Sequence, residues 1–155
     1  MYSSFSIYGW PQRDEEYKEV FAKCEEHPGI NYHGAVSNDE IREALKISHI
    51  FAFPSIWPET SCIAAIEAMS AGVGIVCPNF AALPETTASL ANIYQWNEDM
   101  STHASYFASV LDVIIENYWH ESLQSRFMYA KNYADNMYNW ESRKEEWVNF
   151  LQSLK

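Results

Sequence analysis

The chain has 155 residues, which is about the size of one domain. Its 21 acidic residues outnumber 10 basic ones and give a formal net charge of −11. This balance argues against nucleic acid or an anionic membrane surface as the main partner, because both bind basic patches. A hydrophobic share of 48% excludes a disordered chain.

The three cysteines, Cys24, Cys62 and Cys77, are odd in number and lie in apolar surroundings, which is typical of reduced core residues. The sequence has neither a CxxC nor an HxxxH pattern, so we expect no structural zinc site. No apolar run is long enough to span a bilayer, and the first residues lack the layout of a signal peptide. These features together predict a cytoplasmic protein.

Short apolar runs alternate with longer amphipathic ones along the first 80 residues. The spacing of apolar residues predicts a helix over 14–27, and Ser37 with Glu40 matches a capping box that starts a second helix. The run 49–53 is almost continuously apolar, which predicts a strand buried on both faces and therefore a parallel sheet. The other elements expected before Trp96 are strands at 5–8, 30–33, 74–77 and 92–95, a helix at 61–71 and a short helix at 83–88.

After Trp96 the pattern is helical only. Helices are expected over 101–118 and 122–138, and Asn139 can cap a last helix. The alternation before Trp96 predicts an α/β fold, a doubly wound and mostly parallel sheet with right-handed crossovers, to which the C-terminal helices are added. Because no repeat or linker interrupts the pattern, we expect residues 1–155 to form one domain.

In such sheets, ligands bind outside the carboxyl ends of the strands, where helix N-termini present free NH groups. The segment of interest therefore connects the strand that ends at Phe53 to the next helix, which is expected to begin near Thr60 or Ser61. With either residue as cap, the third helical position is apolar, so no carboxylate covers the first amides. A phosphate bound there would gain about 0.3–1 kcal/mol from the helix dipole.

Glu67 is the only charged residue of a helix that is apolar on nearly every side. An unpaired buried carboxylate costs on the order of several kcal/mol, so Glu67 needs a partner. Three explanations remain open: a ribose diol as the partner, a distant Arg or Lys as the partner, or a helix that is less buried than its apolar sequence predicts. Glu59 lies just before this helix, on the same side of the sheet as the free amides, and taken alone it is explained as a solvated acid favoured by the dipole.

Seven residues separate Glu59 from Glu67. The residues 68–72 come directly after Glu67, and the strand expected at 74–77 follows them. This arrangement resembles the Glu-x7-Glu signature of retaining glycosyltransferases with the GT-B fold, the glycosyl transferases group 1 or family 4. Further matching positions are Pro54-Ser55, Ala68-Met69, Gly72, Ile75-Val76, Pro84-Glu85, the segments 5–9 and 30–36, and Trp140. The likeness covers nearly the whole chain.

The resemblance implies the Rossmann-like, donor-binding half of an enzyme that transfers a hexosyl unit from a nucleotide-diphosphate sugar to an acceptor hydroxyl. Glu59 would be the catalytic residue, because it would orient the donor sugar and stabilise the charge that develops on it. Glu67 would accept hydrogen bonds from the ribose. The other donor-binding residues would be Gly9, Thr60, Ser61, Cys62 and Ile63, the amides of the last three holding the diphosphate. No cofactor and no metal are needed, and the sequence offers no acidic DxD motif.

The chain also departs from the family pattern. In the family, the donor-binding domain opens with an earlier strand and helix, which carry an Arg and a Lys that clamp the diphosphate. No part of this sequence matches that strand and helix. No part of it matches the family's acceptor-binding domain either. Trp10 replaces the second glycine of a GxG motif, and Ala81-Ala82 stands where glycines usually lie. We therefore expect a donor domain truncated at its N-terminus, which binds the donor weakly and does not turn it over.

The expected partners are the nucleotide-sugar donor and the missing N-terminal acceptor domain. Any weak membrane association would occur only through that domain, and no nucleic acid is expected. The last helix should expose Trp140 and Trp147 or bury them in a contact with a second copy of the chain.

Two other functions remain open. A nucleotide-sugar epimerase of the GT-B type would bind the same donor, although the Glu-x7-Glu spacing is less typical of it. An inactive α/β binding or interaction module is the second, because the diphosphate clamp is missing. A flavodoxin-like receiver is a poor match, because the third strand is followed by Pro54-Ser55 and not by an acceptor Asp.

Overall fold

The computed structural model describes residues 15–154. The chain divides into two compact units, residues 1–41 and residues 42–155, and each is described separately. The expected strand at 5–8, Gly9 and Trp10 lie outside the described residues. Within the described part of the chain, no helix is both long and apolar enough to cross a membrane.

The first unit contains helix α2 (Lys18–Glu26), which corresponds to the helix expected over 14–27 and has no buried residue. The strand expected at 30–33 is wrong, because these residues adopt no strand conformation. The amide of Ile30 donates to the carbonyl of His27 in a turn, and the ring of Tyr32 stacks on Phe21 with 5.7 Å between centroids. The segment therefore packs on α2 through one aromatic side chain and pairs with no described strand.

The capping box at the start of α3 (Asn38–Ile47) is confirmed. The Glu40 carboxylate accepts from the backbone NH of Ser37 at 3.0 Å and from its hydroxyl at 2.7 Å, while the Glu40 amide donates back to the Ser37 hydroxyl at 3.3 Å. These bonds satisfy the amides that a helix start leaves free. They also hold the pKa of the Glu40 carboxyl below its usual value.

The second unit contains a parallel sheet of three strands among the described residues, in the order β1 (Ile50–Ala52), β2 (Gly74–Pro78), β3 (Asn92–Tyr94). Every residue of the central strand β2 is buried. In β1 the first two residues are only half-buried and Ala52 is exposed, so the expected burial of 49–53 on both faces is wrong. The physical reason is position: β1 lies at the edge of the described sheet and pairs only with β2.

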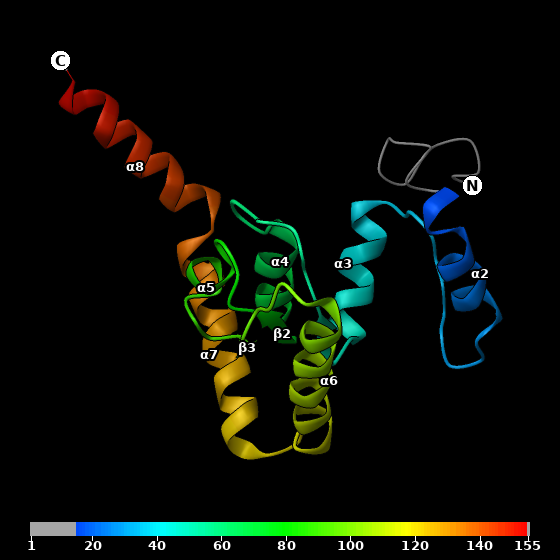
Figure 1. The fold of residues 1–155 in the computed structure, drawn as a ribbon. Coiled ribbons are helices and arrows are strands. Elements are labelled where there is room, and N and C mark those ends of the chain that lie inside the picture. The colour runs from blue at the N-terminus through cyan, green and yellow to red at the C-terminus, as the bar shows by residue number, and fades with distance from the viewer. Residues whose placement is uncertain (1–14, 155) are drawn as a thin grey trace. The chain divides into compact units, whose positions relative to one another are not determined.

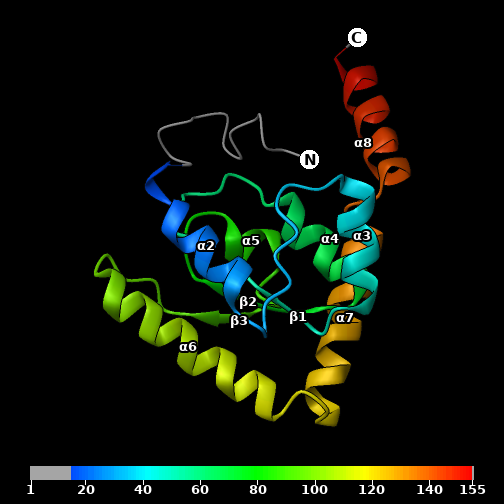
Figure 2. The same cartoon turned by 90° about the vertical axis from the view of Figure 1, so that its right-hand side faces the viewer.

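Helices cover both faces of this sheet. Ile75 and Cys77 belong to a core cluster shared with α4 (Ile63–Ala71), whereas Val76 packs with Ile114 of α6 (Met100–Glu116) and Phe127 of α7 (Glu121–Met137). Because neighbouring residues of a strand face opposite sides, α4 and α6 lie on opposite faces (Figures 1 and 2). The fold is therefore the mixed α/β, parallel-sheet architecture that the sequence predicts.

The remaining helices also match the expected pattern. The short α5 (Leu83–Thr86) follows β2, and α8 (Trp140–Ser153) follows α7 directly. Asn139 caps α8 as expected, since its side chain accepts from the Ser142 amide at 2.8 Å. Gly72 ends α4 with a φ of +80°, a left-handed conformation that glycine adopts without steric cost.

Candidate functional site

The N-terminus of α4 lies at the carboxyl edge of the parallel sheet, because α4 is the crossover between the parallel strands β1 and β2. Its cap residue is Cys62, in an extended conformation, and no side chain accepts a capping hydrogen bond there. The first turn also contains no acidic residue. The first amides of α4 are therefore left without a carboxylate or hydroxyl partner from the cap position.

The helix begins at Ile63, later than the expected start near Thr60 or Ser61. The extended backbone of Cys62 keeps the two preceding residues in the loop, where both are exposed. Of the amides assigned to the diphosphate, those of Cys62 and Ile63 thus belong to the helix start. The amide of Ser61 does not.

The Cys62 thiol is buried at this helix start. Burial raises its pKa, and the negative charge of Glu59 raises it further, whereas the amides of Ala65 and Ala64 act in the opposite direction. Two conclusions follow. Glu59 lies close enough to the start of α4 to act on this thiol, and a thiol with a raised pKa is a weak nucleophile at neutral pH.

The loop that carries Glu59 is attached to the loop after β2. The amide of Ala82 donates to the Glu59 carbonyl at 3.1 Å, and the amide of Glu59 donates to the Trp57 carbonyl at 2.9 Å. Glu59 itself is half-buried. Its backbone is therefore fixed at the carboxyl edge of β1 and β2, where the sequence placed it.

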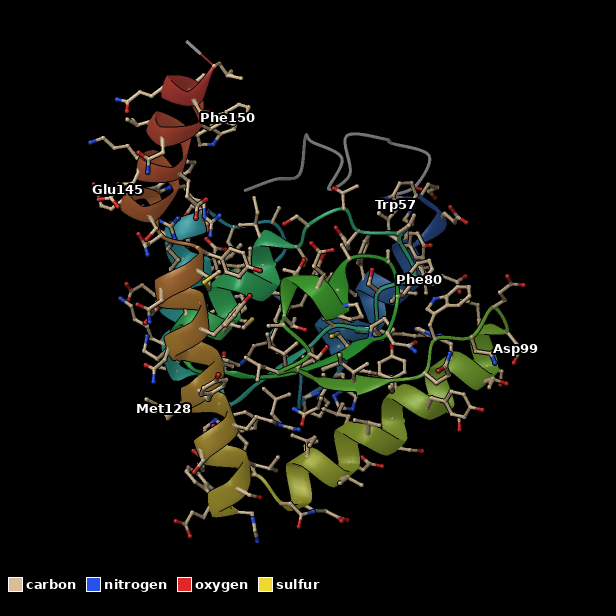
Figure 3. All side chains as sticks on the ribbon, turned by 90° about the vertical axis from the view of Figure 1, so that its left-hand side faces the viewer. Trp57, Phe80, Asp99, Met128, Glu145 and Phe150 are labelled. Carbon is tan, nitrogen blue, oxygen red and sulfur yellow. The ribbon has the colours of Figure 1, made fainter. Side chains whose placement is uncertain are left out.

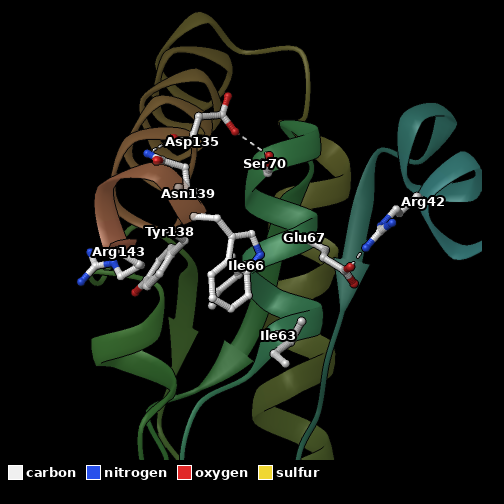
Figure 4. Close-up of a pocket in the computed structure, with 11 residues that line it drawn as sticks. Arg42, Ile63, Ile66, Glu67, Ser70, Asp135, Tyr138, Asn139 and Arg143 are labelled. Atoms are coloured by element: carbon white, nitrogen blue, oxygen red, sulfur yellow. Dashed lines mark hydrogen bonds and ion pairs between the residues drawn. The ribbon is translucent and has the colours of Figure 1, made fainter. Parts of the chain in front are cut away.

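Glu67 lies one helical turn after Ile63 on α4, and its partner is Arg42 of α3. The Nε atom of Arg42 is 3.3 Å from Oε1 of Glu67, and 21% of the Glu67 side chain is exposed (Figure 4). The structure thus contains the ion pair with a distant Arg that was one of the alternatives for this carboxylate. The sequence offered no signal for Arg42, which lies 25 residues away.

A groove of about 520 Å³ lies beside Glu67, between α4 and the junction of α7 with α8 (Figure 4). Ile63 and Glu67 line it from α4, and Arg42 lines it from α3. The residues that line it do not include Glu59, Thr60, Ser61 or Cys62. The structure therefore brings Ile63 and Glu67 together in one groove and places Glu59 with Cys62 at the helix start.

A polar cluster between α4 and α7 was not anticipated from the sequence. The Ser70 hydroxyl donates to Asp135 at 2.5 Å, and Lys131 donates to both the Ser70 carbonyl and Asp135. Partial burial acts to raise the pKa of the Asp135 carboxyl, but the bonds from Ser70 and Lys131, with the Lys131 charge, hold it below its usual value. The cluster joins α4 to α7, and its Ser70 and Asp135 line the groove.

An aromatic pair at the carboxyl edge was also missed. Phe80, in the loop after β2, stacks on Trp96, in the loop after β3, with 4.4 Å between ring centroids and 9° between ring planes. Asn79 fixes the pair, because its side chain accepts from the Trp96 amide at 2.7 Å and donates to Gln95 at 3.0 Å. Figure 3 shows Phe80 and Trp57 in loops of this edge.

Between Phe80 and Ala82, Ala81 has a φ of +49°, which is costly for a residue with a Cβ atom. This strained residue lies next to the amide that binds the Glu59 carbonyl. Among the described residues, no group of three His, Cys, Asp or Glu side chains could hold a metal ion.

One of three comparisons with known proteins identifies a family. The family model for glycosyl transferases group 1 matches residues 4–111 of the chain, a range that contains β1, α4, β2 and both acids of the Glu-x7-Glu pair. Neither the curated proteins nor the solved structures gave a significant match.

Proposed function

Since the chain belongs to the family of glycosyl transferases group 1, we propose that it binds a nucleotide-diphosphate sugar at the start of α4. The observation that carries the proposal is the uncapped N-terminus of α4 at the carboxyl edge, with Glu59 beside it and Glu67 one turn into the helix. A helix N-terminus stabilises a diphosphate through its free amides and its dipole.

The proposed roles follow from these positions. The amides of Cys62 and Ile63 bind the diphosphate, Glu59 orients the donor sugar, and Glu67 accepts hydrogen bonds from the ribose hydroxyls. A carboxylate has about four lone-pair sites, so Glu67 can accept from a ribose while Arg42 holds it in position. Arg42 thus has an orienting role in the donor complex.

The proposed reaction is transfer of a hexosyl unit with retention. The bond between the anomeric carbon and the diphosphate oxygen breaks, and the electron pair leaves with the diphosphate, whose added charge the helix amides stabilise. Glu59 stabilises the positive charge on the sugar until the acceptor oxygen forms the new bond and passes its proton to the oxygen of the departing diphosphate. The roles proposed here require no metal. The acceptor is bound by a separate domain, so we expect residues 1–155 alone to bind the donor weakly and to give no turnover.

Calorimetric titration with UDP-glucose, GDP-mannose and ADP-glucose tests the proposal on the parent chain and on Glu67→Ala. We expect at least one donor to bind in the millimolar range, and Glu67→Ala to weaken it about 10-fold or more, because a hydrogen bond to a charged group contributes about 1.5–3 kcal/mol. Glu116→Ala, which removes an exposed acid at the end of α6, is the matched control and should bind as the parent does.

Two outcomes would contradict the proposal. If none of the three donors binds to the parent, the donor site is wrong. If Glu67→Ala binds a donor as tightly as the parent does, the ribose role of Glu67 is wrong. Far-UV circular dichroism of each variant excludes unfolding as the cause of a loss.

A further inference from the structure

The loops at the carboxyl edge of the described sheet carry acidic side chains and no basic one. The loops that follow β1, β2 and β3 are residues 53–62, 79–82 and 95–99. They contain Glu59, Glu98 and Asp99 but no Lys, Arg or His. The sequence has no Lys or Arg at all between Lys46 and Arg126. Backbone amides at the start of α4 can bind a diphosphate at this edge, but no side chain of these loops can neutralise a further negative charge on a ligand.

Short contacts hold these three loops together around Glu59. The Glu59 carbonyl accepts from the amide of Ala82 at 3.1 Å, which ties the first loop to the second. The rings of Phe80 and Trp96 stack with 4.4 Å between their centroids, which ties the second loop to the third. A sugar that contacts the Glu59 carboxylate therefore lies against a frame of fixed loops, because each loop is attached to the next.

Trp57 is a large exposed residue of this frame. It is 64% exposed, and its ring stacks on no other ring within residues 15–154. Its backbone, in contrast, is held on both sides. The amide of Trp57 donates to the Ser55 hydroxyl at 3.2 Å, and its carbonyl accepts from the Glu59 amide at 2.9 Å. Pro58, whose ring restricts φ, joins Trp57 to Glu59. The indole ring is therefore attached to a rigid backbone, two residues before the carboxylate that is proposed to bind the sugar.

A hexose has a surface that matches this ring. The C–H groups on one face of a hexose form an apolar patch with partial positive charge, and the face of an indole ring is negative. Stacking the two removes apolar area from water and leaves the hydroxyls at the rim of the sugar free to donate to a carboxylate. A single exposed tryptophan elsewhere on a surface needs no ligand, but Trp57 adjoins the carboxylate to which these hydroxyls are assigned.

We propose that the hexose of the donor stacks on Trp57 and that the site selects an uncharged hexose. This inference rests on the proposed function and names the sugar class of the same site. A hexuronate on Trp57 would bring its carboxylate next to Glu59, where the edge loops supply Glu98 and Asp99 and no cation. Like charges without a counter-ion disfavour such a ligand, so the discrimination follows from the missing basic residues.

Calorimetric titration of the full chain tests the stacking. The ligands are UDP-glucose, GDP-mannose and ADP-glucose, each compared with its nucleoside diphosphate, which lacks the hexose. Trp57→Ala should weaken binding of the donor about 5- to 10-fold, because the aromatic contact is lost, and should change binding of the nucleoside diphosphate less than about 2-fold. Trp57→Phe keeps a ring and should lose less than about 3-fold. The control is Trp119→Ala, which removes a 77% exposed tryptophan beyond the far end of α6 and should bind as the parent does.

A second comparison tests the selection by charge. The donor that binds is titrated beside its counterpart with a carboxylate at C6, which is UDP-glucuronate, GDP-mannuronate or ADP-glucuronate. We expect the parent to bind the hexuronate at least about 10-fold more weakly, since the added carboxylate meets acids and no cation. Saturation-transfer NMR on the neutral donor should show strong transfer to the hexose C–H protons in the parent and a marked loss of that transfer in Trp57→Ala.

Three results would overturn the proposal. If Trp57→Ala weakens the donor and the nucleoside diphosphate equally, or weakens neither, the hexose does not stack on this ring, whereas the donor site at the start of α4 stands. If the hexuronate binds as tightly as the neutral donor, the selection for an uncharged hexose is wrong. If neither a donor nor a nucleoside diphosphate binds to the parent, the proposed function is wrong and the stacking on Trp57 is wrong with it.

Discussion

Ala81 is an alanine at a position where the family pattern has a glycine, and its backbone conformation is one that favours glycine. The sequence places Ala81-Ala82 where the family usually has glycines, and Ala81 is held at a φ of +49°. A left-handed conformation costs a residue with a Cβ atom about 1–2 kcal/mol, and such strain persists only when the surroundings enforce it. Here the stacked Phe80 before it and the Ala82–Glu59 hydrogen bond after it fix the loop.

We therefore expect Ala81→Gly to stabilise the chain by up to about 1 kcal/mol, because the relief of strain exceeds the entropy cost of glycine, about 0.5–1 kcal/mol. Ala104→Gly, in the exposed interior of α6, should instead destabilise by about 1 kcal/mol. Urea unfolding of the parent and the two variants measures both changes in the free energy of unfolding, including their signs. Equal losses at the two positions would show that the left-handed conformation carries no strain.

At the scale of the elements, the contact between β2 and α7 leaves no room for a side chain at Gly74. A Cβ atom added to Gly74 would lie 2.7 Å from Cζ of Phe127, closer than Cβ atoms come to other side-chain atoms in folded proteins. Phe127 is 4% exposed and belongs to the cluster that packs α6 and α7 on the sheet. The absence of a side chain at Gly74 thus allows the ring of α7 to reach the strand.

Gly74→Ala should destabilise the chain by about 1–3 kcal/mol, the usual cost of overpacking a core. Phe127→Leu shortens the side chain that the new methyl group meets, so the double variant should lose less than the sum of the two single losses. Urea midpoints of the parent, both single variants and the double variant form a double-mutant cycle. Strictly additive losses would mean that the two positions do not meet.

Charge governs the behaviour of the entire chain in acid. The 21 acidic residues repel one another at neutral pH, and some of those that the structure describes have a specific partner that favours the ionised form. Asp135 is such a residue, since Ser70 and Lys131 hold the pKa of its carboxyl below the usual value of 3.8. A carboxyl whose pKa is lower in the folded chain contributes stability above its unfolded value, and this contribution is lost as the pH falls through the folded value.

The free-energy difference between the parent and Asp135→Asn should therefore be constant near neutral pH and should shrink as the pH falls below about 4. Thermal unfolding of both chains from neutral to acidic pH measures it. Asp112→Asn, at an exposed position of α6, is the control for the removal of one negative charge. A difference that stays constant down to the lowest accessible pH would contradict the assigned role of the Ser70–Asp135–Lys131 cluster.

Local patterns in the sequence were enough to locate most elements of the second unit and two of the caps. The Ser37–Glu40 box and the Asn139 cap join residues three positions apart, so the sequence contains both partners of each bond within one turn. The Glu-x7-Glu spacing and the strand–helix alternation likewise located the family and the loop before α4. These features depend on neighbours along the chain, and the order of the residues specifies them.

Other features depend on how distant segments meet, and only the folded chain settles them. Arg42 reaches Glu67 because α3 packs beside α4, and Phe80 stacks on Trp96 because β2 and β3 pair in parallel. The half-exposed β1 and the missing strand at 30–33 have the same origin, since a strand is completed by its neighbour and an apolar run does not specify one. Periodicity gives each segment its conformation, whereas long-range contacts depend on the relative placement of segments, which no local pattern encodes.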